Sequence, residues 1–356
     1  METTRKNVLV VGGGIIGLAS AFRLAAAHHR VTVFDPSTGM GATWAAAGMI
    51  APSAEIAPGE QSNYEIQKRA LQSWRDVADL LEALTHERLV FGETGTLLVG
   101  WDTSDRRQLD QFVTIAREFE APMTTVTRLV SPDMFLGISA RISEGVLMGG
   151  DAWIDPDQAV RLLLAALTKL GAQVINERVV QVRSENGEVI ASTKDHEFRG
   201  DRGLLATGAS GLPVGAHSRE NSVRPIRGAT VRVQGLDRSD QPSVRAFVRG
   251  RAFYMVSRPG GYCVLGASAD ERAEAVLEVG ELQRLLRDGL DVVPELETAK
   301  VLETRIGLRP ASPSLESFFE RLDLQGWAWS SGHYRHGVAL APIAALDALD
   351  FVEGGT

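Results

Sequence analysis

Near its N-terminus the chain reads NVLVVGGGIIG over residues 7–17, and the run LASAFRLAAA follows at once. Residues Asn7 to Val11 are mostly β-branched or apolar and predict a strand, whereas the alanines and leucines of Leu18 to Ala27 predict a helix. A second short strand is expected at Val31 to Phe34, with Asp35 at its end. The order of strand, glycine turn, helix, strand and acid predicts the first unit of a parallel α/β sheet.

The glycines of this turn have the spacing that a dinucleotide pyrophosphate requires. Gly12 permits the tight turn, Gly14 lets the backbone approach the phosphates, and Gly17 packs the helix against the strand. The helix N-terminus offers amides and a positive dipole end to the anion. Asp35 is placed for a ribose hydroxyl, and an acid there argues against a 2′-phosphate. The ligand is therefore expected to be NAD or FAD.

Composition and charge narrow the class of protein. The 356 residues predict two domains, and the 44% hydrophobic and 23% charged residues are typical of an ordinary enzyme. A net charge of −8 argues against nucleic acid and anionic lipid as partners, and no apolar run is long enough to span a bilayer. The first apolar run is interpreted as strand and helix rather than as a signal peptide. Cys263 is the only cysteine, which argues against disulfides and against a zinc or iron–sulfur site, so we expect no metal and a cytoplasmic location.

The segment after Asp35 favours a flavin over a nicotinamide. Residues 39–49 read GMGATWAAAGM, and such small side chains suit close approach of the backbone to a large planar ligand. The AAAGM run, after GGGIIG and a terminal acid, resembles the D-amino-acid oxidase superfamily of FAD enzymes. Within it the resemblance is to the glycine oxidase branch of thiamine biosynthesis and to the sarcosine oxidases. It covers nearly the whole chain and is densest at residues 7–55, 204–210 and 305–342.

The resemblance implies a set of cofactor-binding positions. Residues 204–209 read LLATGA, similar to a family segment in which a strand end passes near the cofactor, and Val179 corresponds to a valine whose backbone contacts adenine. Residues 331–342 read SGHYRHGVALAP, similar to a family element in which a helix beginning near Gly337 faces the flavin pyrimidine. In full, the expected FAD contacts are Gly12, Gly14, Ile15, Ile16, Gly17, Asp35, Pro36, Ala42, Thr43, Ala47, Gly48, Met49, Val179, Thr207, Gly208, His333, Tyr334, Arg335, His336, Gly337, Val338 and Ala339.

Three residues are expected to act on the substrate by the same resemblance. Arg309, in the GLRP segment 307–310, corresponds to the arginine that clamps the substrate carboxylate, and a guanidinium between Leu and Pro can present two parallel donors. Tyr254 matches a tyrosine that points into the substrate cavity, and Arg335 matches a second active-site arginine. Arg258 is expected to face solvent. His333 is interpreted as part of a loop that follows the flavin, not as a general base.

The expected fold class is α/β. It consists of a Rossmann-like FAD-binding domain of the DAO type and a discontinuous substrate domain built on a mainly antiparallel sheet plus helices. Residues 1–84, 151–219 and 306–356 are assigned to the FAD domain, and residues 85–150 and 220–305 to the substrate domain. Short strands are expected at Gly95 to Val99, Val223 to Gln234, Ala252 to Ser257 and Gly261 to Gly266, with a strand also at Val179 to Val182; helices are expected at Ser104 to Phe119 and Asp157 to Leu170.

The function that the resemblance implies is oxidation of a small amino acid or amine that bears a carboxylate. Candidates are glycine, sarcosine, an N-substituted or N-amino glycine, or a small D-amino acid, with hydride passing from Cα to flavin N5. Reduced flavin would then be reoxidised by O2, giving H2O2, or by another acceptor. FAD is expected to be noncovalent because Cys263 lies far from the C-terminal motif that carries covalent flavin in sarcosine oxidases. A homo-oligomer is expected from family precedent alone.

Alternatives stay open at this point. The chain could be an FAD-dependent amino-acid dehydrogenase of a specialised biosynthetic pathway, an NAD-dependent reductase, or a flavin-binding protein without turnover. The sequence also departs from the family after GLRP, where residues 314–320 read SLESFFE instead of a polar turn with a PxIG segment. That difference leaves the shape of the substrate cavity open.

Overall fold

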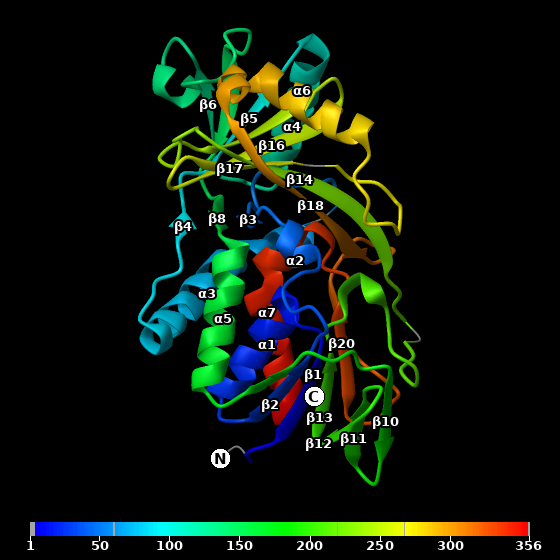
Figure 1. Cartoon of the computed structure of the whole chain (residues 1–356). Coiled ribbons are helices and arrows are strands. Elements are labelled where there is room, and N and C mark those ends of the chain that lie inside the picture. The colour runs from blue at the N-terminus through cyan, green and yellow to red at the C-terminus, as the bar shows by residue number, and fades with distance from the viewer. Residues whose placement is uncertain (1–3, 60, 219, 267, 355–356) are drawn as a thin grey trace.

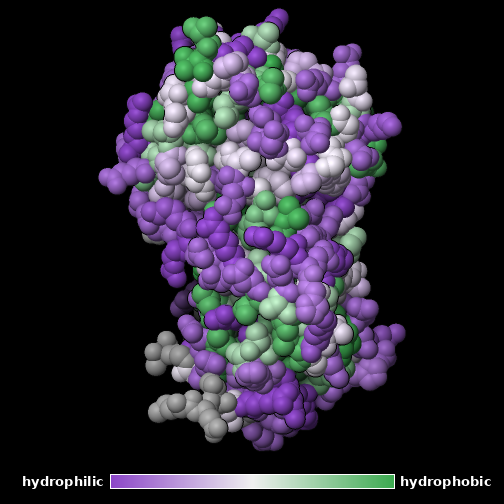
Figure 2. Space-filling view, turned by 90° about the vertical axis from the view of Figure 1, so that its left-hand side faces the viewer, coloured by the Kyte–Doolittle hydropathy of each residue, from purple (hydrophilic) through white to green (hydrophobic). Residues whose placement is uncertain are grey.

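The computed structural model describes residues 4–59, 61–218, 220–266 and 268–354. In Figure 1 they form two lobes, one above the other. The lower lobe is built on a six-stranded sheet and the upper lobe on an eight-stranded one. Figure 2 shows hydrophilic residues over most of one side face, with hydrophobic side chains in smaller groups on both lobes. None of the helices in the described part of the chain is long and apolar enough to cross a membrane.

The lower sheet is the parallel sheet that the N-terminal motif predicts. Its strands are β1 (Asn7–Val11), β2 (Arg30–Phe34), β9 (Gln173–Ile175), β13 (Arg202–Leu205), β19 (Phe318–Arg321) and β20 (Trp327–Ser331). Their order is β19-β20-β13-β1-β2-β9, and only the edge strand β19 is antiparallel to its neighbour. The central strands are almost fully buried, as expected when both faces of a sheet are covered.

Four helices cover one face of this sheet and a small sheet covers the other (Figure 1). The helices are α1 (Ile15–Ala26), α3 (Gln61–Thr85), α5 (Pro156–Lys169) and α7 (Gly337–Glu353). The small sheet contains β10 (Gln181–Glu185), β11 (Glu188–Ser192) and β12 (Glu197–Gly200). A short helix, α2 (Ala42–Ala45), and the three-stranded sheet of β3 (Met49–Ile50), β4 (Phe91–Gly92) and β8 (Ala152–Ile154) lie between the lobes.

The upper sheet is assembled from two separate parts of the chain. Its strands are β5 (Thr96–Gly100), β6 (Met123–Thr127), β7 (Glu144–Met148), β14 (Arg224–Gln234), β15 (Ser243–Val248), β16 (Arg251–Arg258), β17 (Tyr262–Gly266) and β18 (Lys300–Ala311). Their order is β18-β14-β17-β16-β15-β5-β7-β6, with one parallel pair, β15 with β5. The outer face carries α6 (Val279–Val292), whereas α4 (Thr103–Glu118) packs on the inner face, against Leu98, Val146 and Met148. The short 3-10 helices are η1 (Pro132–Phe135), η2 (Gly208–Ser210), η3 (Pro294–Thr298) and η4 (Tyr334–His336). The expected α/β fold class is confirmed.

Alternation along the upper strands separates two faces. On β16, Phe253 and Met255 pack into the outer core with α6, whereas Tyr254 and Val256 belong to a cluster on the inner face. On β17, Cys263 belongs to the outer core. Since successive side chains of a strand point to opposite faces, the even-numbered residues of β16 face the lower lobe.

Some element boundaries differ from the prediction. Helix α1 begins at Ile15 rather than Leu18 because the turn ends at Gly14, the N-cap residue. The strand expected at Val179 to Val182 begins only at Gln181. Strand β18 runs through the expected domain boundary between residues 305 and 306 and pairs with β14 along its length. The division into two discontinuous domains stays a prediction.

Helix α7 contains a proline deeper than its first turn. Pro342 is the sixth residue of the helix, so it denies the Val338 carbonyl its usual i to i−4 hydrogen bond. The indole Nε1 of Trp74, on α3, donates to that carbonyl at 2.8 Å. The Trp74 side chain therefore supplies the hydrogen bond that the proline denies to the Val338 carbonyl. Helix α7 continues to Glu353.

Candidate functional site

A cavity of about 670 Å³ lies between the two lobes. Its floor is formed by the turn after β1, by residues 39–49 and by the N-terminal residues of α1 and α7. Its roof is formed by residues of β14, β16 and β18 on the inner face of the upper sheet. Its far end reaches Arg178 and Val179, before β10. The cavity is therefore long and runs across the carboxyl ends of parallel strands, where ligands of open α/β sheets bind.

The turn between β1 and α1 depends on two glycines that have no room for a side chain. Gly12 has a φ of +114°, and a Cβ there would lie 2.2 Å from the carbonyl oxygen of Ala206. A Cβ on Gly17 would lie 1.9 Å from the carbonyl oxygen of Gly12. At Gly14, by contrast, the nearest atom to a Cβ would be Thr43 Oγ1 at 3.5 Å, and the space in front of it is the cavity.

Hydrogen bonds fix the surroundings of this turn. One carboxylate oxygen of Asp35 accepts from the backbone N–H of Gly13 at 2.7 Å, and the other accepts from Ser37 N–H at 2.7 Å. Each oxygen keeps a second acceptor position, since a carboxylate oxygen has two lone pairs. The hydroxyl of Thr43 accepts from the first amide of α1, Ile15 N–H, at 3.0 Å. These bonds hold the carboxylate at the cavity and tie residues 42–45 to the start of α1.

The cavity has features that suit a dinucleotide cofactor. Three buried hydroxyls on residues of its lining, those of Thr207, Ser330 and Ser331, lack a hydrogen-bond partner among the described residues. Two helices, α1 and α7, begin at it, and small residues line its floor. Buried hydroxyls ordinarily have partners, so their orphaned state here indicates a polar ligand. The residues present therefore fit FAD.

Arg309 and Tyr254 converge on one point of the roof. A Cβ on Gly228 would lie 2.2 Å from Arg309 Nη1, so the guanidinium of β18 lies over β14. A Cβ on Gly266 would lie 2.3 Å from the Tyr254 hydroxyl oxygen, so the ring of β16 lies over β17. Because β14 and β17 are adjacent, the two side chains point toward each other across their glycines.

Arg309 and Tyr254 both have hydrogen-bond donors available for an anion. Arg309 Nη1 donates to the Ser268 carbonyl at 3.0 Å, which orients the guanidinium, and no described carboxylate forms an ion pair with it. Burial raises the pKa of the Tyr254 phenol, and this outweighs the opposing effect of Arg309. The phenol is therefore a neutral donor across the physiological pH range. Together they offer donors to a carboxylate at the roof of the cavity.

An ion-pair cluster that the sequence interpretation missed closes one wall of the cavity. Glu55 accepts from Arg245 Nη1 at 2.8 Å, and its other oxygen lies 3.1 Å from His336 Nδ1 and 3.6 Å from Arg335 Nε. Burial opposes ionisation of Glu55, but Arg245 and then the His336 hydrogen bond hold the pKa of its carboxyl well below the usual range. Strand β15 supplies Arg245, and alternation between the buried Val244 and Ala246 could have indicated its inward direction.

His333 is buried and lines the cavity. Burial, helped by the neighbouring His336, lowers the pKa of its imidazole to about 4. The ring is therefore neutral at pH 7, and it is a weak base. The interpretation of His333 as part of a loop that follows the flavin stays a prediction.

Most of the predicted site residues line this one cavity. They are Gly12, Gly14, Ile15, Ile16, Asp35, Pro36, Ala42, Thr43, Ala47, Gly48, Met49, Val179, Thr207, Gly208, Tyr254, Arg309, His333, Tyr334, Arg335, Gly337 and Val338. Gly17, His336 and Ala339 lie behind the lining. Gly17 packs on the glycine turn, and the His336 ring contacts the Glu55 carboxylate. Ala339 lies on α7 and is buried in the core of the lower lobe.

Two expectations need correction or narrowing. Arg258 does not face solvent: it is 3% exposed, because it lies on the inner face of β16, four residues after Tyr254. The unusual loop at residues 314–320 contributes nothing to the cavity lining, which ends at Pro310 on this strand. The loop packs instead beside β20, where Glu316 O lies close to Gly332. Its residues are therefore not part of the cavity wall, but they contact Gly332, between the lining residues Ser331 and His333.

The chain is similar to known proteins over nearly its whole length. A family model described as FAD dependent oxidoreductase (DAO) matches residues 7–349. Glycine oxidase of Geobacillus kaustophilus strain HTA426 is 28% identical over 363 residues, which cover 99% of this chain and 94% of the relative. Glycine oxidase of Pseudomonas putida strain KT2440 is 28% identical over 98% of this chain and 95% of its own length.

Solved structures share the whole architecture. The crystal structure of glycine oxidase from Geobacillus kaustophilus has a TM-score of 0.88 and 25% identity, over 98% of this chain and 95% of that one. Iminodiacetate oxidase from Chelativorans sp. BNC1 has a TM-score of 0.85 and 22% identity, over 98% of this chain and 96% of that one. The second similarity concerns the fold alone.

Proposed function

Because this chain belongs to the DAO family of FAD-dependent oxidoreductases, we propose that it oxidises the C–N bond of a small amine that bears a carboxylate. The observation that carries the proposal is the convergence of Arg309 and Tyr254 over Gly228 and Gly266, above the small residues of the cavity floor. Glycine oxidases are among the relatives, which favours glycine or an N-substituted glycine as substrate. Sarcosine, an N-amino glycine and a small D-amino acid are the other candidates.

The cofactor is held by the floor of the cavity. The N-terminus of α1 and the Gly12 to Gly14 turn would bind its pyrophosphate, and Asp35 would accept from a ribose hydroxyl. The N-terminus of α7, at Gly337, would face the pyrimidine edge. FAD is noncovalent in this proposal, since Cys263 is buried in the outer core and its thiol contacts Leu236 O and Ser257 Oγ at 3.6 Å. When bound, FAD supplies the acceptor for the two electrons and the hydrogen of the substrate Cα–H bond.

The chain's own residues bind and orient the substrate. Arg309 donates to the carboxylate, and the Tyr254 hydroxyl donates a further hydrogen bond, so the substrate has one orientation under the roof. Glu55 is already held by Arg245 and His336, and His333 is a neutral, weak base. The amine is therefore expected to react in its neutral form without a side-chain base, and its C–N bond becomes an imine that water hydrolyses.

A substrate panel tests this function. The holoprotein is incubated with glycine, sarcosine, iminodiacetate and D-alanine, and both O2 consumption and H2O2 are recorded. The expected result is turnover of at least one of these amines with one H2O2 formed per O2 consumed. If turnover occurs only with an artificial electron acceptor, the chain is a dehydrogenase, as the alternative of a specialised biosynthetic enzyme requires. The absence of turnover with every amine under both conditions would contradict the proposal.

A further inference from the structure

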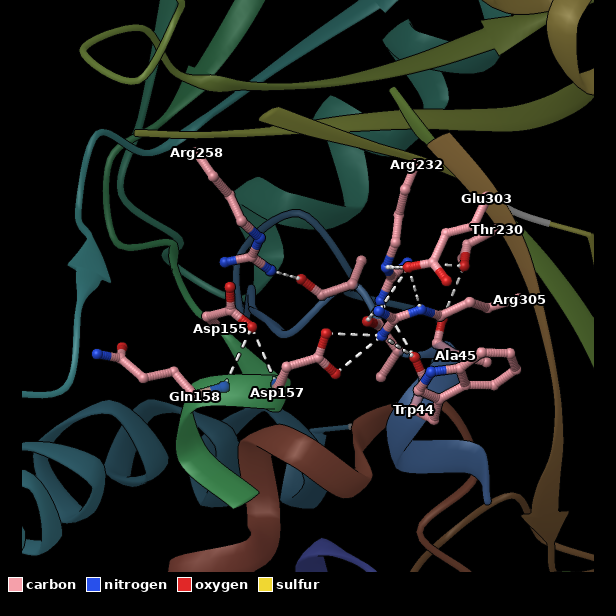
Figure 3. Close-up of polar contacts among 12 residues, drawn as sticks. Trp44, Ala45, Asp155, Asp157, Gln158, Thr230, Arg232, Arg258, Glu303 and Arg305 are labelled. Atoms are coloured by element: carbon pink, nitrogen blue, oxygen red, sulfur yellow. Dashed lines mark hydrogen bonds and ion pairs between the residues drawn. The ribbon is translucent and has the colours of Figure 1, made fainter. Parts of the chain in front are cut away.

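Three arginines of the upper sheet lie beneath its inner face, outside the cavity lining. In Figure 3 the guanidinium groups of Arg232 and Arg305 lie together, and that of Arg258 lies apart from them. Arg232 lies on β14, Arg258 on β16 and Arg305 on β18. They are 2%, 3% and 8% exposed. A buried guanidinium loses its hydration, which is costly unless its donors find partners. The partners of these three groups therefore indicate what the cluster is for.

Two of the arginines hold the end of the short helix α2. Arg305 Nη1 donates to the Trp44 carbonyl at 2.9 Å, and its guanidinium lies over the Trp44 ring, 5.0 Å from the centroid. Arg232 Nη2 donates to the same carbonyl at 3.1 Å and to the Ala46 carbonyl at 3.3 Å. The last carbonyls of a helix have no partner inside it, so an external donor is needed here.

The two carbonyls that remain in this segment are held in the same way. Thr230, on β14, donates from its hydroxyl to the Ala45 carbonyl at 3.0 Å. Arg258 Nη2 donates to the Ala47 carbonyl. Four successive carbonyls, from residue 44 to residue 47, are thus bound by side chains from three strands of the upper sheet, and Figure 3 shows these side chains reaching the segment from the sheet.

Arg258 has few other polar contacts. Arg305 forms ion pairs with Asp157 at 2.7 Å and Glu303 at 2.6 Å. For Arg258 no described carboxylate is within ion-pair distance; its guanidinium lies 4.5 Å from the centroid of the Trp153 ring, and its Nη1 has no partner. Its hydrogen bond to the Ala47 carbonyl is therefore the main polar contact that offsets its burial.

The opposite side of the same segment faces the cavity. Ala45, Ala46, Ala47, Gly48 and Met49 all line it. The side chains of the first three are single methyl groups, so the position of the backbone decides how closely a planar ligand is contacted. Donors on the upper sheet hold the segment from one side, and the cavity lies on the other.

We propose that Arg232, Arg258 and Arg305 are positioning residues for FAD, because they hold residues 44–47 against the cofactor. Strand β18 then serves both ligands: Arg305 fixes the flavin side of the cavity, and Arg309, four residues later on the same face, binds the substrate carboxylate. The inference rests on the proposed function only in that FAD is the ligand. FAD affinity then depends on three side chains that do not line the cavity.

The test compares FAD affinity among matched variants. Arg258→Met removes one donor while keeping most of the side-chain volume. Thr230→Val removes both the donor to the Ala45 carbonyl and the acceptor for Arg232 Nη1, without deleting a buried charge. Arg251→Met is the control, since Arg251 lies on the same strand but pairs with Asp288 on the outer face. Each protein is stripped of flavin and titrated with FAD by the quenching of flavin fluorescence, and the thermal unfolding of each apoprotein is recorded.

The expected dissociation constants differ by variant. Arg258→Met should raise the Kd for FAD about tenfold or more, the lower end expected for a lost charge-assisted hydrogen bond, and Thr230→Val about threefold or more. The visible bands of the bound flavin should change shape in both variants, and Arg251→Met should match the wild type. Arg258→Lys, which keeps a cationic donor, should recover part of the affinity.

Two results would overturn the inference. If Arg258→Met and Thr230→Val lower the unfolding temperature of the apoprotein but leave the Kd for FAD within twofold of wild type, the cluster only supports the fold. If Arg258→Met does not fold, Thr230→Val alone decides the question by the same criterion. Failure of the wild type itself to bind FAD would instead remove the cofactor assignment, and the inference with it.

Discussion

At the scale of single residues, the site depends on where two glycines lie as much as on its functional side chains. Arg309 and Tyr254 can be predicted from their sequence motifs, but their convergence follows from Gly228 and Gly266 on the strands between them. Which glycine lies under which side chain is decided by strand order and register. These depend on the pairing of segments far apart in the chain, so the sequence pattern alone does not reveal them.

Arg309→Met tests the carboxylate clamp. The variant should lose about 10- to 150-fold in kcat/KM, since a hydrogen bond to a charged group contributes about 1.5–3 kcal/mol. The Kd for FAD should stay unchanged, because the guanidinium lies in the roof. Arg199→Met, which removes an exposed ion pair with Glu188 on the distant β11/β12 hairpin, is the control and should retain full activity. Steady-state kinetics with the best amine of the panel measure both, and an unchanged kcat/KM in Arg309→Met would refute the clamp.

His333 predicts how the stability of the apoprotein depends on pH. Its pKa is about 4 in the folded state, against 6.5 for the ordinary imidazole, so below pH 6.5 the unfolded chain binds more protons. Stability is therefore lost as the pH falls through this window, by about 2 kcal/mol between pH 7 and pH 5 from this residue alone. Urea unfolding of the apoprotein and of His333→Gln at both pH values isolates the contribution. The loss should be smaller by that amount in the variant; equal losses in the two proteins would show that His333 does not titrate in this way.

At the scale of elements, regular patterns were the easier part of the prediction. The strand β1 and the helices α1 and α5 follow from the hydrophobic pattern and glycine punctuation, whereas α7 was expected from the family resemblance. The predicted strand at Val179 to Val182 is right for its last two residues and wrong for its first two, because β10 begins at Gln181. The proline in α7 could not be interpreted locally, because its compensation comes from Trp74 on another helix.

Substitution by alanine at Gly14 and at Gly17 should have different effects on stability and on FAD binding. Gly17→Ala places a Cβ 1.9 Å from the Gly12 carbonyl oxygen, so the apoprotein should lose about 1–3 kcal/mol of stability by overpacking. Gly14→Ala meets only Thr43 Oγ1, at 3.5 Å, so it should fold almost normally but bind FAD poorly, because the methyl group enters the space for the pyrophosphate. Urea unfolding and FAD titration of both variants check this contrast. Equal stability losses in both would contradict the assigned division of roles.

At the scale of the whole molecule, the two lobes share the site. The lower lobe lines the floor of the cavity with backbone amides and small residues. The upper lobe lines the roof and contributes charged side chains from its inner face. The sequence predicted the α/β fold class and the N-terminal glycine turn, because the pattern of strand, turn and helix is local. It did not predict the pairing of Glu55 with Arg245, since these residues lie 190 positions apart. Long-range pairing of charges leaves no local signal. The inward direction of Arg258 does have a local signal, because it shares the even positions of β16 with Tyr254.

The measurement that bears most directly on the central claim is the visible spectrum of the purified protein, before and after anaerobic addition of excess glycine, sarcosine or iminodiacetate. We predict flavin bands in the isolated protein and their bleaching by at least one of these amines, but not by the same amine in Arg309→Met at equal concentration. Flavin bands that persist with every amine, or a protein that binds no FAD, would contradict the account of a carboxylate-directed, FAD-dependent amine oxidation.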